Sequence, residues 1–157
     1  RPDLAVCAMP HVDRPIRLVM VGEGTQRALV EELARSLGVS DRVDFAGGVD
    51  EQVLVDLYKG ALAVVYSPFD EDYGYVTLES FLARKPVITT TDAGGPLEFV
   101  EAGTNGFVAE PVPAAIAEAV NRLAADRRRA ASLGDAGYER ARLVTWEGVI
   151  EKLVQSR

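Results

Sequence analysis

Residues 61–90 read ALAVVYSPFDEDYGYVTLESFLARKPVITT, and this stretch sets the fold class. A short apolar run at residues 61–66 is followed by a polar loop, by a segment of helical period at about residues 75–84, and by a second apolar run at residues 86–90. A strand, a helix and a strand in that order predict a βαβ unit with parallel strands. We expect residues 61–66 to form a fully buried central strand, because the run is apolar on both faces.

The same alternation of short apolar runs and helical segments continues on both sides of this unit. On the N-terminal side we expect a helix ending at Met9, a strand at residues 16–21, and a helix capped by Thr25 and ended by Gly38. A strand at residues 43–46 should follow, and then a helix at residues 51–59 that packs through Val53, Leu54, Leu57 and Tyr58. On the C-terminal side we expect a short helix after Gly94-Gly95, a small strand at residues 107–108, and helix from about Ala114 with a break near Gly134. The sequence therefore predicts an α/β domain built on a parallel sheet.

Length and charge narrow the classes of function. The 157 residues fit a single domain, and 24 acidic against 17 basic residues give a formal net charge of −7, which argues against nucleic acid as a partner. Cys7 is the only cysteine and His11 the only histidine, so neither an intramolecular disulfide nor a zinc site is expected. No apolar run approaches the roughly 18 residues of a membrane-spanning helix, and no signal peptide is expected. We therefore expect a cytoplasmic protein that contains no metal.

Polar loops that contain glycine follow the strands. In an open parallel sheet, ligands bind beyond the carboxyl ends of the strands. The loops expected there lie at residues 22–25, 47–51, 70–76 and 92–96, and the needs of tight turns explain each one taken singly. Position 27 is arginine, which removes the third glycine of a dinucleotide fingerprint, and neither a Walker lysine nor a Gly-x-Ser-x-Gly elbow is present.

The loop at residues 67–79 is the most informative of these segments. Glu71 lies in the loop, Gly74 opens the following helix, and Glu79 lies just over one turn inside it. The backbone amides of Gly74, Tyr75 and Val76 could hold a diphosphate, while the two carboxylates accept hydrogen bonds from sugar hydroxyls. Acidic residues near a helix start also simply stabilise the helix dipole, so the sequence pattern leaves both interpretations open.

The same residues carry a resemblance to a known family. Residues 67–88, with Glu71 and Glu79 in an E-x7-E arrangement, and residues 92–98 resemble the donor-binding domain of the retaining group 1 (family 4) glycosyltransferases. Residues 18–24 and 43–47 match family landmarks in the right order, so the resemblance covers nearly the whole chain. It implies a Rossmann-like three-layer α/β/α domain over residues 1–157, which is the C-terminal half of a GT-B fold without its first strand. The N-terminal acceptor domain of such an enzyme would be absent.

The resemblance also implies a role for each site residue. The donor would be a nucleotide-diphosphate sugar, transferred with retention of configuration and without a metal or other cofactor. Glu79 would hold the ribose hydroxyls, and Glu71 would touch the transferred sugar. The amides of residues 74–76 would hold the diphosphate, and the base would lie near Val49 and Asp50. The implied catalytic residues are Glu71 and Glu79, and the implied donor-binding residues are Gly22, Gly24, Val49, Asp50, Gly74, Tyr75, Val76 and Glu79.

Two departures from the family pattern qualify these expectations. Residues 83–85 read Ala-Arg-Lys where the family usually has Ala-x-Gly, so the helix does not end on glycine. The family's diphosphate-neutralising Arg and Lys precede the helix that ends at Met9 and are not found here, and Arg1 is not assigned that role. We therefore expect the isolated chain to be inactive, with any membrane contact made through the acceptor domain. The alternatives are a non-catalytic nucleotide-sugar-binding module, or an α/β interaction domain with Trp146 as an anchor.

Overall fold

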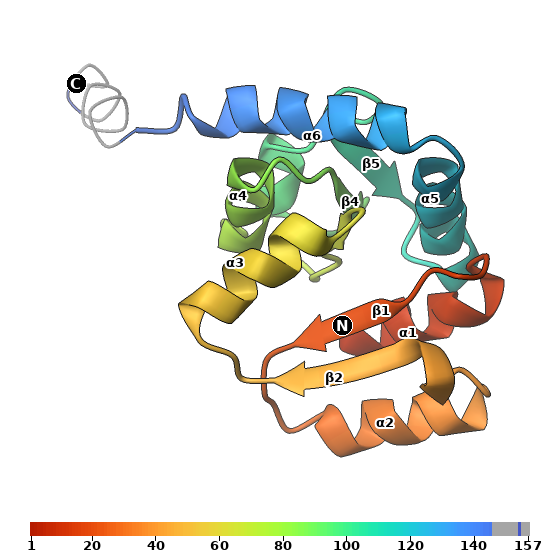
Figure 1. Ribbon diagram of the computed structural model, residues 1–157. Helices are drawn as coiled ribbons and strands as arrows, with labels where there is room; N and C mark the ends of the chain where they lie inside the picture. Colours follow the sequence, from red (N-terminus) through yellow and green to blue (C-terminus); the bar gives the residue numbers. More distant parts are fainter. Residues whose placement is uncertain (146–153, 155–157) are drawn as a thin grey trace.

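The computed structural model describes residues 1–145 and residue 154, so Trp146 lies outside the described residues. Helices and strands alternate along the chain as the sequence predicts (Figure 1). The elements are α1 (Pro2–Ala8), η1 (Met9–His11), β1 (Leu18–Val21), α2 (Arg27–Ser36), η2 (Ser40–Arg42), β2 (Val43–Gly47), α3 (Glu51–Gly60), β3 (Val64–Val65), α4 (Tyr75–Leu82), β4 (Val87–Thr90), η3 (Gly95–Glu98), β5 (Gly106–Ala109), α5 (Pro113–Ala125) and α6 (Arg127–Ala141). No helix among the described residues is long and apolar enough to cross a membrane.

The paired strands are parallel, as predicted, but they form two sheets rather than one. β1 pairs with β2, starting from Leu18 opposite Val43. β4 lies between β3 and β5, with Val64 opposite Val87 and Val87 opposite Gly106. In Figure 1 the pair β1 and β2 lies apart from β4 and β5. Two of the four residues of β1, Val19 and Val21, are exposed although they are apolar, and they alternate with the half-buried Leu18 and Met20.

The prediction of a fully buried central strand at residues 61–66 is wrong. The strand there, β3, is only two residues long, half-buried, and lies at the edge of its sheet. The central, fully buried strand is β4, because β3 and β5 cover both of its edges. An apolar composition predicts burial of a strand, but it does not say which strand has neighbours on both sides.

Helices cover both faces of the β3–β5 sheet, which confirms the three-layer arrangement. Ile88 of β4 belongs to one apolar cluster with Val6 of α1 and Ile116 of α5. Its neighbour Val87 points to the opposite face, where it packs with Phe81 of α4. Successive residues of a strand point to opposite faces, so these adjacent residues anchor two different helical layers.

α6 packs against α4, and glycines make this contact possible. The expected helix break near Gly134 is wrong, since α5 gives way to α6 at Asp126, whose side chain caps α6 by accepting from the Arg129 amide at 2.9 Å. Gly134 lies inside α6, where an added Cβ would come within 2.0 Å of the Arg84 carbonyl oxygen. A Cβ at Gly137 would lie 2.4 Å from the Phe81 ring. These glycines therefore set the distance between α6 and the helix that carries Glu79.

Two smaller expectations also need correction. Gln26, not Thr25, occupies the N-cap position of α2, and it makes no side-chain capping bond. Val53 is 42% exposed instead of packing α3 against the core. As expected, α4 does not end on glycine, and Arg84 takes the left-handed conformation that glycine usually supplies, with φ of 58°. The pairing of its guanidinium with Asp135 and its position over the Tyr138 ring hold it there.

Replacing Gly134 with alanine tests the close contact between α4 and α6. We expect Gly134→Ala to lower the free energy of unfolding by about 1–3 kcal/mol, because its methyl group would overlap a backbone carbonyl that cannot rotate away. Urea unfolding followed by circular dichroism measures the change. Gly60→Ala is the matched control, since a Cβ there meets open space. If the two variants unfold at the same urea concentration, the close contact is not a constraint on the fold.

Candidate functional site

The loop after β3 and the turn after β4 are joined backbone to backbone. The amides of Asp70 and Glu71 donate to the carbonyls of Asp92 and Ala93, each at 3.0 Å. In return the Gly95 amide donates to the Glu71 carbonyl at 2.6 Å. These bonds continue the parallel pairing of β3 and β4 past the end of the sheet. Main-chain hydrogen bonds therefore position the backbone of Glu71.

Three glycines make this contact possible, and sequence reasoning treated two of them only as turn residues. A Cβ on Gly94 would lie 2.6 Å from the Glu71 carbonyl oxygen, and one on Gly95 would lie 2.5 Å from that of Asp72. A Cβ on Gly74 would lie 2.6 Å from the Pro96 ring. A glycine pair followed by proline, at the end of a strand beside another glycine-bearing loop, is the signal that could have indicated this contact.

Arg1 fastens the same two segments from the side. Its guanidinium donates to both carboxylate oxygens of Asp92, at 2.8 and 2.7 Å. It also donates to the carbonyls of Ser67 and Pro68 and to the Thr90 hydroxyl. The hydrogen bond from Arg1 lowers the pKa of Asp92. Arg1 therefore pairs with Asp92 and fastens the loop after β3 to the turn after β4.

α4 begins directly after this fastened loop. Gly74 occupies its N-cap position with φ of 77°, and the Thr77 amide bonds back to the Gly74 carbonyl at 2.9 Å. Among the described residues, the amides of Gly74, Tyr75 and Val76 donate to no protein acceptor. No acidic residue lies in the first turn. The helix dipole and three unpaired donors therefore make this end of α4 suited to an anion.

The two glutamates of the E-x7-E pattern flank this helix end, and each has a tyrosine beside it. The Tyr58 hydroxyl, from α3, donates to Oε2 of Glu79 at 3.0 Å. Burial, together with the neighbouring Glu79 carboxylate, raises the pKa of Tyr58 to about 12. Burial, with the charge of Glu71, also raises the pKa of Tyr66. The sequence pattern indicates only a packing role for Tyr58 and a strand end for Tyr66, and it does not reveal that both lie beside the glutamates.

The remaining expected donor-binding residues form a second group, at the carboxyl ends of β1 and β2. The Gly22 amide donates to the Gly47 carbonyl at 2.8 Å, which joins the two loops. The carboxylate of Asp50 accepts from the Val53 amide at 2.9 Å and caps α3. Gly24 lies exposed beside Gly22, and Val49 is half-buried before Asp50. No hydrogen bond of the described residues joins this group directly to Glu71 or Glu79. α3 connects the two groups, because it begins after Asp50 and carries Tyr58 in its last turn.

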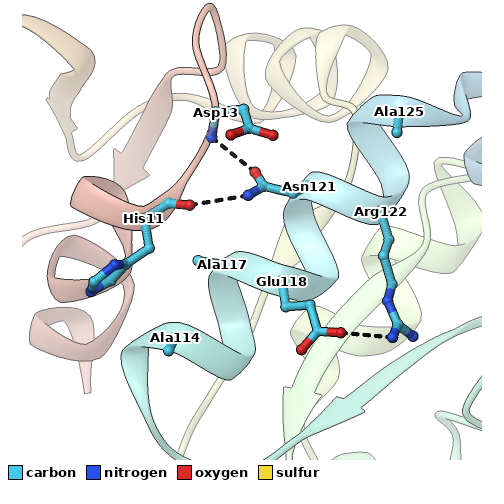
Figure 2. A pocket seen from close by; sticks show the side chains of 8 residues that line it. All are labelled: His11, Asp13, Ala114, Ala117, Glu118, Asn121, Arg122 and Ala125. Carbon is cyan, nitrogen blue, oxygen red and sulfur yellow. Dashed lines mark hydrogen bonds and ion pairs between the residues drawn. The ribbon is translucent and has the colours of Figure 1, made fainter.

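A hollow of about 460 Å³ lies elsewhere, between the segment after α1 and one side of α5 (Figure 2). Alanines of α5 form part of its wall, and Asn121 bridges the His11 carbonyl and the Asp13 amide at 3.0 and 2.9 Å. It shares no lining residue with either group of expected donor-binding residues. The site expected from the sequence is therefore a surface formed by loops and a helix end, distinct from this hollow.

Comparison with known proteins gives consistent matches. The family described as glycosyl transferases group 1 matches residues 1–140. A D-inositol 3-phosphate glycosyltransferase from Corynebacterium diphtheriae is 32% identical over 145 residues, covering 90% of this chain and 34% of that protein. A GDP-mannose-dependent alpha-(1-6)-phosphatidylinositol monomannoside mannosyltransferase from Mycobacterium tuberculosis is 35% identical over 148 residues, covering 87% of this chain and 38% of that protein. The chain thus spans little more than a third of the length of these relatives.

Solved structures match over almost the whole chain. Sucrose-phosphate synthase from Thermosynechococcus elongatus superposes with a TM-score of 0.86 at 29% identity, covering 98% of this chain and 40% of that one. Anabaena Alr3699/HepE, solved in complex with UDP, superposes with a TM-score of 0.85 at 25% identity, covering 98% of this chain and 44% of that one. Both matches extend over the described sheets and helices together.

Replacing Gly95 with alanine tests whether the backbone contact places Glu71. The added methyl would overlap the Asp72 carbonyl, so we expect the bond between the residue-95 amide and the Glu71 carbonyl to weaken. The amides of residues 71 and 95 should then exchange with deuterium about tenfold faster or more, which corresponds to roughly 1.4 kcal/mol of lost protection. Gly24→Ala, where the Cβ meets open space, is the control. Unchanged exchange at both amides in Gly95→Ala would contradict this account.

Proposed function

The chain belongs to the group 1 glycosyl transferases, and on that premise we propose that it holds the nucleotide-diphosphate sugar for a retaining glycosyl transfer. Its fold is the C-terminal half of the GT-B arrangement, to which the matched structures belong. In this proposal a separate acceptor-binding domain forms the other wall of the active site, and the chain alone does not turn over. The relatives support this part of the proposal, because this chain covers only 34% and 38% of their lengths.

The observation that carries the proposal is the N-terminal end of α4. Three amides without an acceptor among the described residues lie there, between Glu71 in the preceding loop and Glu79 one turn into the helix. A nucleotide-diphosphate sugar carries a diphosphate anion next to the hydroxyls of its ribose and of its sugar. This end of α4 offers amide donors for the diphosphate and carboxylate acceptors for the hydroxyls. We assign the diphosphate to the amides of Gly74, Tyr75 and Val76.

The remaining donor contacts follow from this placement. We propose that Glu79 accepts hydrogen bonds from the ribose hydroxyls and that Glu71 accepts them from the transferred sugar. The base would lie toward Val49 and Asp50, with Gly22 and Gly24 on the same side, so that the nucleotide extends along α3 from one group of residues to the other. UDP bound to Anabaena Alr3699/HepE and the GDP-mannose named for the mycobacterial relative support a nucleoside diphosphate as the leaving group.

Transfer begins when the bond between the sugar and the diphosphate stretches. Negative charge then grows on the diphosphate, and fixed amides at a helix start stabilise that charge without having to reorient. We propose that no bound metal is needed for this step. Arg1, which binds the carbonyls of this loop, is paired with Asp92, so we expect further positive groups to come from another part of the full-length protein.

Replacing each glutamate with glutamine in the full-length protein tests these roles. We expect Glu79→Gln to weaken nucleoside diphosphate binding about 10- to 100-fold, because it removes a charged acceptor. We expect Glu71→Gln to lower kcat by about 100-fold or more while nucleotide binding is nearly unchanged, since Glu71 faces the sugar. Isothermal calorimetry with UDP and GDP, and a transfer assay, measure the two effects.

Glu139→Gln is the matched control, because Glu139 forms an exposed ion pair with Arg142 on α6. Undiminished transfer in both site variants would contradict the proposed glycosyltransferase mechanism. Nucleotide binding by a full-length protein that transfers no sugar would instead favour the non-catalytic binding module.

A further inference from the structure

We propose that Tyr58 is a positioning residue for Glu79, and that its hydroxyl sets the carboxylate for the ribose of the bound nucleotide. The inference rests on the proposed function and adds a residue that the E-x7-E pattern does not contain. Tyr58 lies 21 positions before Glu79, and its Oη donates to Oε2 of Glu79 at 3.0 Å. The other carboxylate oxygen, Oε1, accepts no hydrogen bond from the described residues, so it is free to receive a ribose hydroxyl.

Without this hydrogen bond, little would restrain the Glu79 side chain. Glu79 is exposed on α4, and no Lys or Arg among the described residues forms an ion pair with it. A free glutamate side chain samples many rotamers, and ordering it when a ligand binds costs free energy. Tyr58 is half-buried and has a stiff ring, so one hydrogen bond from it removes much of that freedom before the nucleotide arrives.

The donor in this hydrogen bond is constant over the physiological range. A phenol whose pKa is raised to about 12 keeps its proton throughout neutral pH, so the carboxylate always faces a donor. An Arg or Lys in the same place would pair with the charge of Glu79 and compete with the ligand more strongly than a neutral hydroxyl does. Tyrosine therefore orients the acceptor while leaving its negative charge available to the ribose.

The position of Tyr58 on α3 extends this role to the rest of the nucleotide. α3 begins at the cap residue Asp50, where the base is proposed to lie, and it has no fully buried residue that would anchor it in the core. Figure 1 shows α3 running from the end of β2 toward α4. The hydrogen bond from Tyr58 to Glu79 thus ties the helix behind the base contacts to the helix that holds the ribose.

The test compares ribose with deoxyribose. UDP, GDP and the 2′,3′-dideoxy form of each are titrated by calorimetry into the full-length protein. The same titrations are made with its variants Tyr58→Phe, Glu79→Gln and Tyr138→Phe. We expect the unmodified protein to prefer the ribonucleotide, and Tyr58→Phe to reduce that preference about 3- to 10-fold, the worth of one oriented hydrogen bond. Tyr138→Phe, which removes a hydroxyl on α6 but keeps the ring that Arg84 lies over, should leave the preference unchanged.

Each outcome separates this inference from the proposed function. If Glu79→Gln loses the preference and Tyr58→Phe keeps it, Glu79 binds the ribose without help and the inference is overturned. If Tyr58→Phe weakens the ribonucleotide and its dideoxy form equally, Tyr58 has only a structural role and the inference is again overturned. If Glu79→Gln retains the full preference, the assignment of Glu79 to the ribose fails. Absence of binding by either nucleotide contradicts both proposals.

Discussion

Two backbone segments touch without any side chain between them, and the position of the candidate site depends on this contact. The loop after β3 and the turn after β4 come together because Gly94 and Gly95 lack a Cβ, which lets the Gly95 amide reach the Glu71 carbonyl. The contact fixes Glu71 directly. It also fixes Gly74 against Pro96, and therefore the direction in which α4 leaves the loop and carries Glu79. Gly134 of α6, next to the backbone of Arg84 just after α4, then lets α6 pack closely on this helix.

The order of the elements could be predicted from the sequence, because the periods of strands and helices are local properties. The predictions that were wrong concern contacts between residues that are distant in the chain. Residues 61–66 are apolar, yet β3 lies at a sheet edge. The central strand is β4, because it pairs with β3 on one side and with β5 on the other. Gly134 was expected to end a helix, but it is there to allow a close approach to the Arg84 carbonyl. In the sequence, a glycine that ends a helix cannot be told from one that allows close packing. Only the packing of α6 on α4 distinguishes the two roles.

The residues of the candidate site also include some that the sequence predicts and some that it does not. Glu71, Gly74 and Glu79 could be predicted because their spacing within one loop and one helix places them around the same helix start. Tyr58 and Asp92 could not, because their partners are 21 and 91 positions away and meet them only after α3, α4 and α1 have packed. The groups at Glu71 and at Gly22 lie at the ends of separate sheets, and the nucleotide proposed here would connect them.

The central claim is that the free amides at the start of α4 hold the diphosphate of the donor. Titration of UDP or GDP into the 15N-labelled chain, followed by amide NMR, tests it most directly. The account predicts the largest shifts at the amides of Gly74, Tyr75 and Val76, since these would gain an anionic acceptor. Shifts confined to residues around the hollow of Figure 2, such as His11 and Asn121, with none at the start of α4, would contradict it.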